Sequence, residues 1–208
     1  MRIGPKYKIA RRLGERIFPK TQTTKFVVSG MDARSRSNQG GKSKRRKTMS
    51  DFGRQLLEKQ KAKYTYGVSE RQFVGYVAKA RGASGKAAEK LFQLLESRLD
   101  NAVFRMGLVR SRAFARQAVA HGHITVNGRK LTIPSYQVKI GDQIAIRPGS
   151  RDNGIFRDLP EKMKEYAAPA WVVVDPATGD GQIKGEPLVK ENEPILQFSS
   201  ILEFYSRV

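Results

Sequence analysis

The sequence predicts an α+β fold, in which a mainly helical domain and a small antiparallel sheet follow a basic N-terminal arm. Between residues 50 and 120, apolar residues recur at the spacing that is typical of amphipathic helices. After residue 123 the pattern changes to the alternation that is typical of strands. The first 49 residues show little periodicity and much positive charge. We therefore expect an extended basic arm before the folded part of the chain.

Positive charge is large and unevenly distributed. Lys and Arg total 40 against 19 acidic residues among 208, so the formal net charge is +21. Residues 1–63 carry +15, residues 64–159 carry +9 and residues 160–208 carry −3. Self-repulsion of this size opposes compaction, which indicates a polyanionic partner. Because no segment approaches the roughly 18 apolar residues of a membrane span, nucleic acid is favoured over a membrane.

The residue types present also bound the chemistry. The chain contains no cysteine, which excludes disulfides and thiolate metal sites. The two histidines, His121 and His123, are two residues apart and make poor zinc ligands. We therefore expect no metal, no cofactor and no small-molecule substrate. The N-terminus lacks the continuous apolar region of a secretory signal, so the expected location is cytoplasmic.

Residues 1–49 form the predicted arm, in which aromatic residues interrupt the basic ones. Residues 29–43 are rich in Ser and Gly and have few apolar side chains, so they cannot by themselves offset the entropy of ordering. Two interpretations remain open, a disordered polybasic tail and an arm that becomes ordered against RNA.

Residues 50–97 are predicted to form three helices. Ser50 is placed to begin a helix that runs to about Lys63, and its lysines are expected on the exposed side. Ser69 and Gln72 form a capping box for a second helix. The third runs from about residue 86 to residue 96.

Residues 98–120 are predicted to form two short helices with basic outer faces. Ser97 and Asp100 have the spacing of a capping box, and Gly107 is a natural stop. Ser111 is placed to cap a helix over residues 112–120. Arg112 and Arg116 are four apart, so both are expected on one exposed face.

The strands follow. Asn127-Gly128 predicts a hairpin with a type I′ turn, and Gly141-Asp142 predicts a second turn before a strand over residues 144–146. Residues 149–158 are expected to form a polar linker, followed by a short helix over residues 160–167 and a strand over residues 171–174. Residues 177–187 are expected to form a turn-rich loop. Residues 195–205 could be a strand or a helix, since the periodicity does not decide between them.

A rigid positive surface of this kind suits phosphates, which Lys and Arg neutralise, while hydroxyl, amide and imidazole groups can donate to phosphate or ribose. Each candidate could instead be an ordinary solvated residue. In residues 98–158 the candidates are Arg98, Arg105, Ser111, Arg112, Arg116, Gln117, His121, His123, Asn127 and Lys130. In the arm and first helix they are Lys6, Lys8, Arg11, Arg12, Lys59 and Lys61.

Several stretches carry a family resemblance. RLDNAVFRMG, SRAFARQAV, HGHITVNGRK and GDQIAI together resemble the RNA-binding fold named after small-subunit ribosomal protein four. GPKYKIARRLG, SDFGRQLLEKQKAKYTYGVSERQF, PAWVVVD and LEFYSR extend the match over nearly the whole chain. The sequence is therefore similar to the bacterial family of small-subunit ribosomal protein four.

The resemblance implies an architecture and a set of roles. It implies a basic arm (residues 1–49), a helical domain (50–97 completed by 159–208) and an inserted RNA-binding domain (98–158). It implies a primary binder of small-subunit ribosomal RNA that nucleates assembly of the subunit body. It further implies contact with small-subunit protein five, a contribution to translational accuracy, and repression of its own messenger RNA. The basic run Lys44, Arg45, Arg46 and Lys47 would lie at the messenger entry channel. Some relatives hold zinc through cysteines in the arm, which this chain lacks.

An enzymatic reading is disfavoured. The triplet Arg98-Leu99-Asp100 is similar to the one that carries the catalytic aspartate of pseudouridine synthases, but here it opens a short helix, where an acid suits the first turn. The alternative to a ribosomal component is a free RNA-binding regulator or modification factor with the same module. A modification factor would require a second, catalytic domain, for which no sequence remains.

Overall fold

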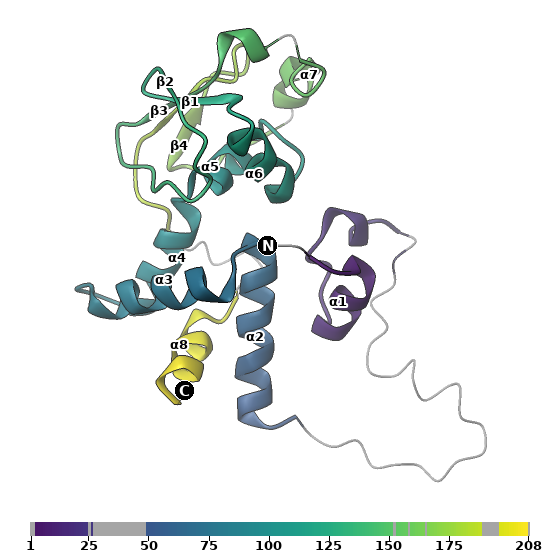
Figure 1. The fold of residues 1–208 in the computed structure, drawn as a ribbon, viewed down its shortest axis with the longest axis vertical. Coiled ribbons are helices and arrows are strands. Elements are labelled where there is room, and N and C mark those ends of the chain that lie inside the picture. The colour runs from purple at the N-terminus through teal and green to yellow at the C-terminus, as the bar shows by residue number, and fades with distance from the viewer. Residues whose placement is uncertain are drawn as a thin grey trace. The chain divides into compact units, whose positions relative to one another are not determined.

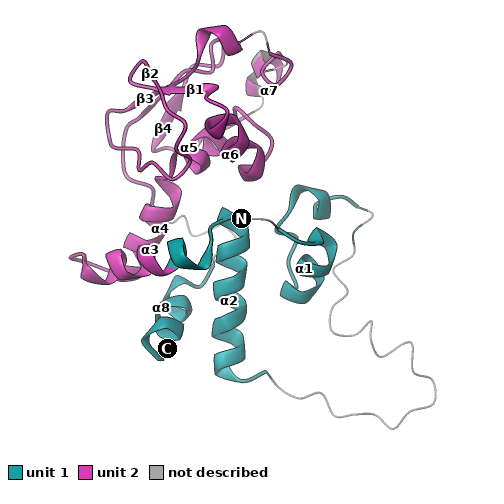
Figure 2. Cartoon of the chain, in the orientation of Figure 1, with its two compact units in different colours: residues 1–73, 196–208 teal, residues 74–195 magenta. Residues whose placement is uncertain are grey.

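The computed structural model describes residues 3–24, 26, 49–151, 153–157, 159–164, 166–188 and 196–207. The basic run Lys44 to Lys47, predicted to lie at the messenger entry channel, is outside the described residues. The chain divides into two compact units, with a boundary inside helix α3 (Figure 2). Unit 1 comprises residues 1–73 and 196–208, and unit 2 comprises residues 74–195.

Unit 1 is helical (Figure 1). The side chain of Ser50 accepts a hydrogen bond from the Gly53 N–H at 3.2 Å, which confirms it as the cap of the following helix. That helix continues three residues beyond the predicted end and stops before Gly67, whose φ is +63°. The elements of unit 1 are α1 (Lys6–Leu13), η1 (Pro19–Thr21), α2 (Asp51–Tyr66), which is the helix that Ser50 caps, the start of α3 (Glu70–Gly82) and α8 (Phe198–Arg207).

The C-terminal segment of unit 1 is a helix because of what it packs against. The rings of Phe52 in α2 and Phe204 in α8 have centroids 5.3 Å apart, and those of Phe73 and Tyr205 are 6.1 Å apart. One face of α8 is therefore covered by apolar side chains from α2 and α3. This contact decides between the strand and the helix that the sequence left open.

Unit 2 contains a five-stranded antiparallel sheet with the order β2-β1-β3-β5-β4. Ile124 lies opposite Ile146 and Val126 opposite Ile144, so the buried side chains of β1 and β3 share one face. The elements are α4 (Ala87–Glu96), α5 (Leu99–Arg105), α6 (Arg112–Ala120), β1 (Ile124–Val126), β2 (Arg129–Lys130), β3 (Gln143–Ile146), η3 (Pro148–Ser150), α7 (Leu159–Lys164), β4 (Val172–Val174) and β5 (Gly181–Ile183).

The hairpin between β1 and β2 confirms the turn prediction. Asn127 has φ of +51° and Gly128 has φ of +77°, so both central residues occupy the left-handed region that a type I′ turn requires. Asn127 is held there by its side chain, whose amide donates to the Asp142 carboxylate at 2.9 Å and whose oxygen accepts from the Gln143 N–H at 2.9 Å. The turn residue thus also ties the hairpin to the start of β3.

Helices α5 and α6 and the sheet enclose the core of unit 2. Leu99, Val103, Ile124 and Ile144 have no exposed surface. Each buried aliphatic side chain of this size contributes about 1.5–3 kcal/mol relative to an exposed one. The α+β prediction is confirmed, and this core sets the rigid frame on which the arginines described below are mounted.

The structure divides residues 159–208 differently from the expected domain. Strands β4 and β5 pair with each other, and β5 pairs with β3, so residues 172–183 join the sheet instead of completing the helical domain. The expected turn-rich loop contains β5, which the sequence hides because it is short and begins with glycine. Glycine is needed at this position of β5, because a Cβ on Gly181 would lie only 2.9 Å from the Val173 carbonyl oxygen. The expected polar linker over 149–158 also contributes Phe156 to the core.

Candidate nucleic-acid interface

Two buried carboxylates organise the basic surface of unit 2. Glu96 is the last residue of α4 and has no exposed side-chain surface, and Asp100 in the first turn of α5 is 5% exposed. Four arginine side chains approach these two acids from α5, α6 and the junction before α5. We call this group the arginine–carboxylate cluster; its charged members are Glu96, Asp100, Arg98, Arg105, Arg112 and Arg116.

Arg98 is the innermost member. Its Nε and Nη2 donate to the two carboxylate oxygens of Asp100 at 3.0 and 2.8 Å, and its Nη1 donates to the Tyr76 hydroxyl at 2.6 Å. Burial alone would lower the pKa of Arg98, but the hydrogen bonds and charge of Asp100 raise it, so the guanidinium stays charged.

The position of Arg98 changes two expectations. Its side chain has no exposed surface, so it does not fit the direct phosphate contact proposed for it. The predicted capping box of Ser97 and Asp100 is wrong, because α5 begins after Arg98 without a side-chain cap and the Asp100 carboxylate is bound by arginine. Pairing with a nearby guanidinium outcompetes the local cap.

Glu96 holds two arginines from different helices. Arg105 in α5 donates from Nε and Nη2 to the two Glu96 oxygens at 2.7 and 3.0 Å. Arg112 in α6 places its Nη2 3.6 Å from Glu96, donates from Nε to the Asn101 side-chain oxygen at 2.6 Å, and lies 4.5 Å from the Phe104 ring centroid. Asn101 in turn donates to Glu96 at 2.8 Å. The guanidinium of Arg112 is therefore fixed from three sides.

Helix α6 carries the outermost arginines. The Ser111 side chain accepts from the Phe114 N–H at 3.2 Å, which confirms it as the cap. Arg116 lies one turn beyond Arg112, and its Nη1 is 3.7 Å from the Asp100 carboxylate. The expected common face exists, but its side chains are only 23% and 34% exposed, and that of Arg105 is 18% exposed. These arginines are half-buried and paired with acids, not simply solvated.

The remaining candidates in unit 2 lie outside this cluster. Gln117, His121 and Lys130 are exposed, as is Asn127, although its side chain serves the hairpin. His123 is half-buried, and its Nδ1 lies 3.0 Å from the Ser150 hydroxyl oxygen. Burial, then the charges of His121 and Arg147, lower the pKa of His123.

In unit 1 the two candidate lysines of α2 are structural. Lys59 donates to Glu70 at 2.9 Å, lies 4.5 Å from the Phe204 ring centroid and is 10% exposed. Lys61 donates to Glu15 and, at 2.8 Å, to Glu58, and is 12% exposed. Their predicted exposure is wrong, because α3, α8 and Glu15 cover the sides of α2 on which they lie.

Glu70 is the anion of this second group. It accepts from Lys59 and Lys63 at 2.9 Å and from the Tyr205 hydroxyl at 2.6 Å. Partial burial alone would raise the pKa of Glu70, but the hydrogen bonds from Tyr205 and the two lysines lower it from 4.5 to about 2. Burial and the bond to Glu70 raise the pKa of Tyr205. These bonds tie the end of α2, the start of α3 and α8 together.

The start of the chain is helical where an irregular arm was expected. In α1, Ala10 and Leu13 are buried, and Ala10 lies in one small core with Phe18 and Phe26. The polar side is basic: Lys6 is half-buried, and Lys8, Arg11 and Arg12 are exposed. The helix forms because its few apolar residues find this core, a contact that the sequence spacing alone does not reveal.

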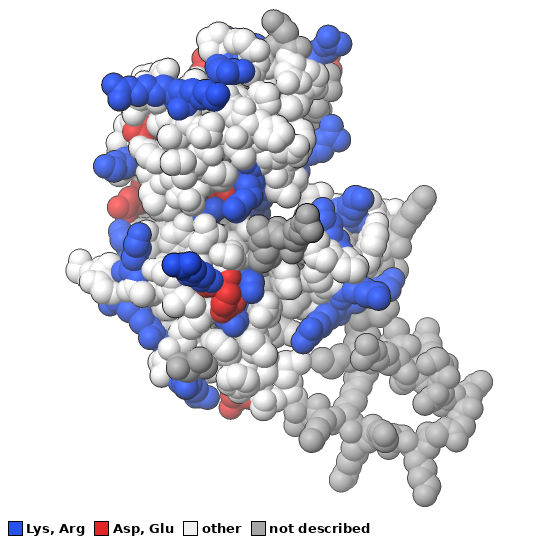
Figure 3. Space-filling view, viewed as in Figure 1, with Lys and Arg blue, Asp and Glu red and all other residues white. Residues whose placement is uncertain are grey.

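The surface also carries more basic than acidic side chains. On the face drawn in Figure 3, Lys and Arg side chains are widely spread and Asp and Glu side chains are few. Among the described residues, no group of three or more His, Asp or Glu side chains could hold a metal ion. None of the described helices has the length and apolar character needed to cross a membrane.

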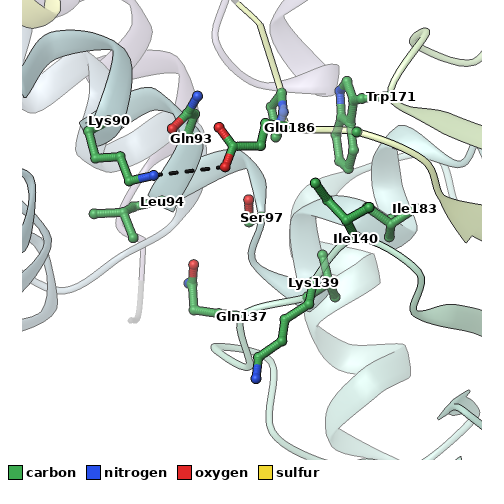
Figure 4. A pocket seen from close by; sticks show the side chains of 13 residues that line it. Lys90, Gln93, Leu94, Ser97, Gln137, Lys139, Ile140, Trp171, Ile183 and Glu186 are labelled. Carbon is green, nitrogen blue, oxygen red and sulfur yellow. Dashed lines mark ion pairs between the residues drawn. The ribbon is translucent and has the colours of Figure 1, made fainter. Parts of the chain in front are cut away.

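Unit 2 also contains a cavity of about 440 Å³. Trp171 and Ile140 lie on one side and Lys90 and Leu94 on the other (Figure 4). Lys90 Nζ is 4.0 Å from a Glu186 carboxylate oxygen, so these two charged groups at the cavity are paired, and Lys139 is a further charged residue of the lining. That the protein takes no small-molecule substrate remains a prediction.

Comparison with known proteins gives a consistent result. The family described as the S4 domain matches residues 97–144, and the family described as the ribosomal protein S4/S9 N-terminal domain matches residues 1–96. Small ribosomal subunit protein uS4 of Roseiflexus castenholzii is 46% identical over 207 residues, which are 99% of this chain and 98% of the relative.

Two further relatives carry the same name. Small ribosomal subunit protein uS4 of Chloroflexus aurantiacus is 44% identical over 208 residues (99% of this chain, 98% of the relative). That of Laribacter hongkongensis is 41% identical over 204 residues (98% of each). The resemblance stated from the sequence motifs is confirmed, and the chain belongs to the uS4 family of small ribosomal subunit proteins.

Proposed function

We propose that this protein binds small-subunit ribosomal RNA through Arg105, Arg112 and Arg116 of the arginine–carboxylate cluster, as a primary binder that nucleates assembly of the subunit body. As a member of its family, the chain is a structural protein of the small ribosomal subunit in the cytoplasm. The proposal adds the surface that makes the contact and the place of that contact in assembly.

One observation carries the proposal, which is the charge balance of the cluster. Counted over the described residues, four guanidinium groups face two carboxylates, which is an excess of two positive charges. The carboxylates are buried while three of the arginines reach the surface. Arginine pairs with phosphate through parallel N–H donors and releases counterions on binding. A surface of this kind, mounted on α5 and α6, favours a particular shape of folded RNA over a base sequence.

The basic side of α1 supports a second contact. Lys8, Arg11 and Arg12 are exposed, and Arg11 lies 5.7 Å from the Phe26 ring centroid, which orients it. The arm as a whole carries much of the net charge. We therefore include α1 in the proposed RNA-binding surface, while Lys59 and Lys61 leave it because they bind acids within unit 1.

The family resemblance extends the proposal to partners. We include contact with small-subunit protein five, with a role in translational accuracy, and contact of Lys44 to Lys47 with messenger RNA at the entry channel. We also propose that the protein represses translation of its own messenger RNA. The excess of Lys and Arg in residues 1–63 supports the RNA contacts. That the protein has no catalytic activity is also part of the proposal.

The RNA surface is tested by filter binding of the full chain to small-subunit ribosomal RNA. Arg112→Gln with Arg116→Gln removes two cations without placing new carboxylates against Glu96 and Asp100. The matched control, Lys139→Gln with Lys184→Gln, removes the same charge from exposed positions outside α5 and α6. Each lost phosphate contact lowers the salt slope by about 0.7–0.9. We expect at least tenfold weaker binding for the arginine variant and a small change for the control; equal losses would overturn the assignment.

The place of the protein in the cell is tested separately by fractionating a lysate on a sucrose gradient. A ribosomal component migrates with small subunits and stays bound through a high-salt wash. A free regulator or modification factor would be found in the light fractions, and that result would contradict the proposed role in assembly.

A further inference from the structure

We propose that Glu96 and Asp100 are positioning residues for RNA binding, which fix the guanidinium groups of Arg105, Arg112 and Arg116 before RNA arrives. The inference rests on the proposed RNA surface and assigns a role to two acids that lie directly behind it. Neither acid contacts RNA in this proposal; each acts through the arginines that it holds.

The presence of these acids requires an explanation, because carboxylates beside an RNA-binding surface repel phosphate. Burying a carboxylate also carries a desolvation penalty, which its partners must offset. Glu96 has no exposed side-chain surface and Asp100 is 5% exposed, so both bear this cost. Apolar side chains of similar volume would often stabilise the fold equally well. The acids therefore contribute something besides stability, and the arginines that they hold indicate what it is.

The geometry shows what Glu96 does. It receives two donors from Arg105 in α5, lies 3.6 Å from Arg112 in α6, and accepts from Asn101, which itself accepts from Arg112. One carboxylate thus sets the orientation of guanidinium groups from two helices. Since Phe104 covers one face of Arg112 at 4.5 Å, its plane is fixed as well.

Asp100 plays the equivalent part for α6. It is bound through both oxygens by the buried Arg98, and its second oxygen lies 3.7 Å from Arg116. The neutral Tyr76 hydroxyl accepts a hydrogen bond from Arg98, so the pair of Arg98 and Asp100 is anchored to α3 within unit 2. The acid that orients Arg116 is itself held in place.

Fixed arginines are an advantage for affinity. A mobile arginine side chain has rotamer entropy, part of which is lost when it binds phosphate. Side chains that are already ordered in the unbound protein lose less on binding, which strengthens the complex. The partial exposure of the three arginines leaves them accessible to phosphate while the acids stay covered.

The sign of one measurement separates positioning from simple electrostatics. Glu96→Gln raises the net charge by one, and charge alone would then strengthen RNA binding. If Glu96 positions the arginines, the same variant binds at least fivefold more weakly and has a shallower salt slope. Glu89→Gln is the matched control, because Glu89 is on the same helix, is 57% exposed and pairs with Lys86. It makes the same charge change and is expected to bind as tightly as the parent or more tightly.

A second variant covers the case in which Glu96→Gln does not fold. Arg112→Lys keeps the charge but loses the donor to Asn101 and the planar group over Phe104. We expect binding several-fold weaker than the parent. Parental affinity and salt slope in Arg112→Lys would overturn the proposal, since a free point charge would then be sufficient. Fluorescence of Trp171, the single tryptophan of the chain, reports whether unit 2 of each variant is folded.

The outcomes distinguish this inference from the proposed function. If removing Arg112 and Arg116 leaves the affinity unchanged, the RNA surface is elsewhere and the proposed function fails with the inference. If that double variant binds weakly while a folded Glu96→Gln binds as tightly as Glu89→Gln, the surface stands and the positioning role is refuted.

Discussion

The burial of Arg98 predicts a large loss of stability when it is removed. Arg98→Met keeps an unbranched side chain of similar length but takes away the three donors that now serve Asp100 and Tyr76. Asp100 would remain 95% buried and lose its main partner. The change therefore breaks a buried ion pair from one side only.

The burial of this ion pair sets the expected loss in the free energy of unfolding. Removing one partner of a buried pair costs about 3–5 kcal/mol, because an uncompensated charge is left inside the protein. Arg116 remains 3.7 Å from Asp100 and offsets part of that cost. We therefore expect a loss near the lower end, about 3 kcal/mol in the free energy of unfolding of unit 2.

Urea unfolding followed by the fluorescence of Trp171 measures this loss. Trp171 is the chain's single tryptophan, is buried in the core of unit 2 and precedes β4, so its signal reports on that unit. Lys86→Ala is the control, because it breaks an exposed pair with Glu89 at 3.1 Å. Exposed pairs contribute less than about 1 kcal/mol, so the control is expected to unfold almost as the parent does.

Two results test the reasoning. Adding Asp100→Asn to Arg98→Met removes the stranded charge and is expected to recover most of the lost stability. A loss below about 1 kcal/mol for Arg98→Met alone would refute the argument, since the pair would then behave like one at the surface.

Three further predictions follow from local contacts. The pKa of Glu70 in the folded state is lowered to about 2. Its stabilisation of unit 1 is therefore complete above pH 4.5 and is lost as the pH falls toward 2. Glu70→Gln should flatten this pH dependence of the stability in circular dichroism melts. Gly107→Ala should lower the stability of unit 2 by about 1–3 kcal/mol, because the φ of Gly107 is +79° and a Cβ there would lie 2.6 Å from the Tyr166 ring. Gly141→Ala is the control, since Gly141 has a φ of +93° but open space around it, so that this variant measures the backbone strain alone. Ser111→Ala should cost about 1 kcal/mol by removing the cap of α6, and an unchanged urea midpoint would contradict that role.

The sequence was most informative where a short segment determines its own structure. Ser50 and Ser111 each accept the hydrogen bond expected of a helix cap, and Ser69 exchanges the two bonds of a capping box with Gln72. The Asn127-Gly128 turn has the backbone that its residue types predict. The caps depend on partners within three residues and the turn depends on its own two residue types, so the pattern of neighbouring side chains is sufficient to find them.

That the candidate residues bind RNA stays a prediction, but the structure changes how several of them are placed. The sequence singled out Arg98, Arg105, Arg112 and Arg116 because they are basic and lie on short helices. It treated Asp100 as an acid of the first helical turn and gave Glu96 no role. Nothing in the spacing reveals that Glu96 binds an arginine nine residues away, or that Arg98 binds a tyrosine 22 residues away. A hint was available in the two acids set among arginines, but pairing cannot be read from composition.

The sequence by itself determined the α+β class, the starts of α2, α3 and α6, the hairpin turn and the family, because these depend on local bonding, periodicity and residue identity. Tertiary structure alone decided that β5 completes a sheet, that α8 is a helix against α2, and that Lys59 and Lys61 are covered. It also decided which arginines are buried and which reach the surface. The physical reason is that burial and pairing depend on which residues distant in the sequence come together, and the free energy of a charge depends on that environment.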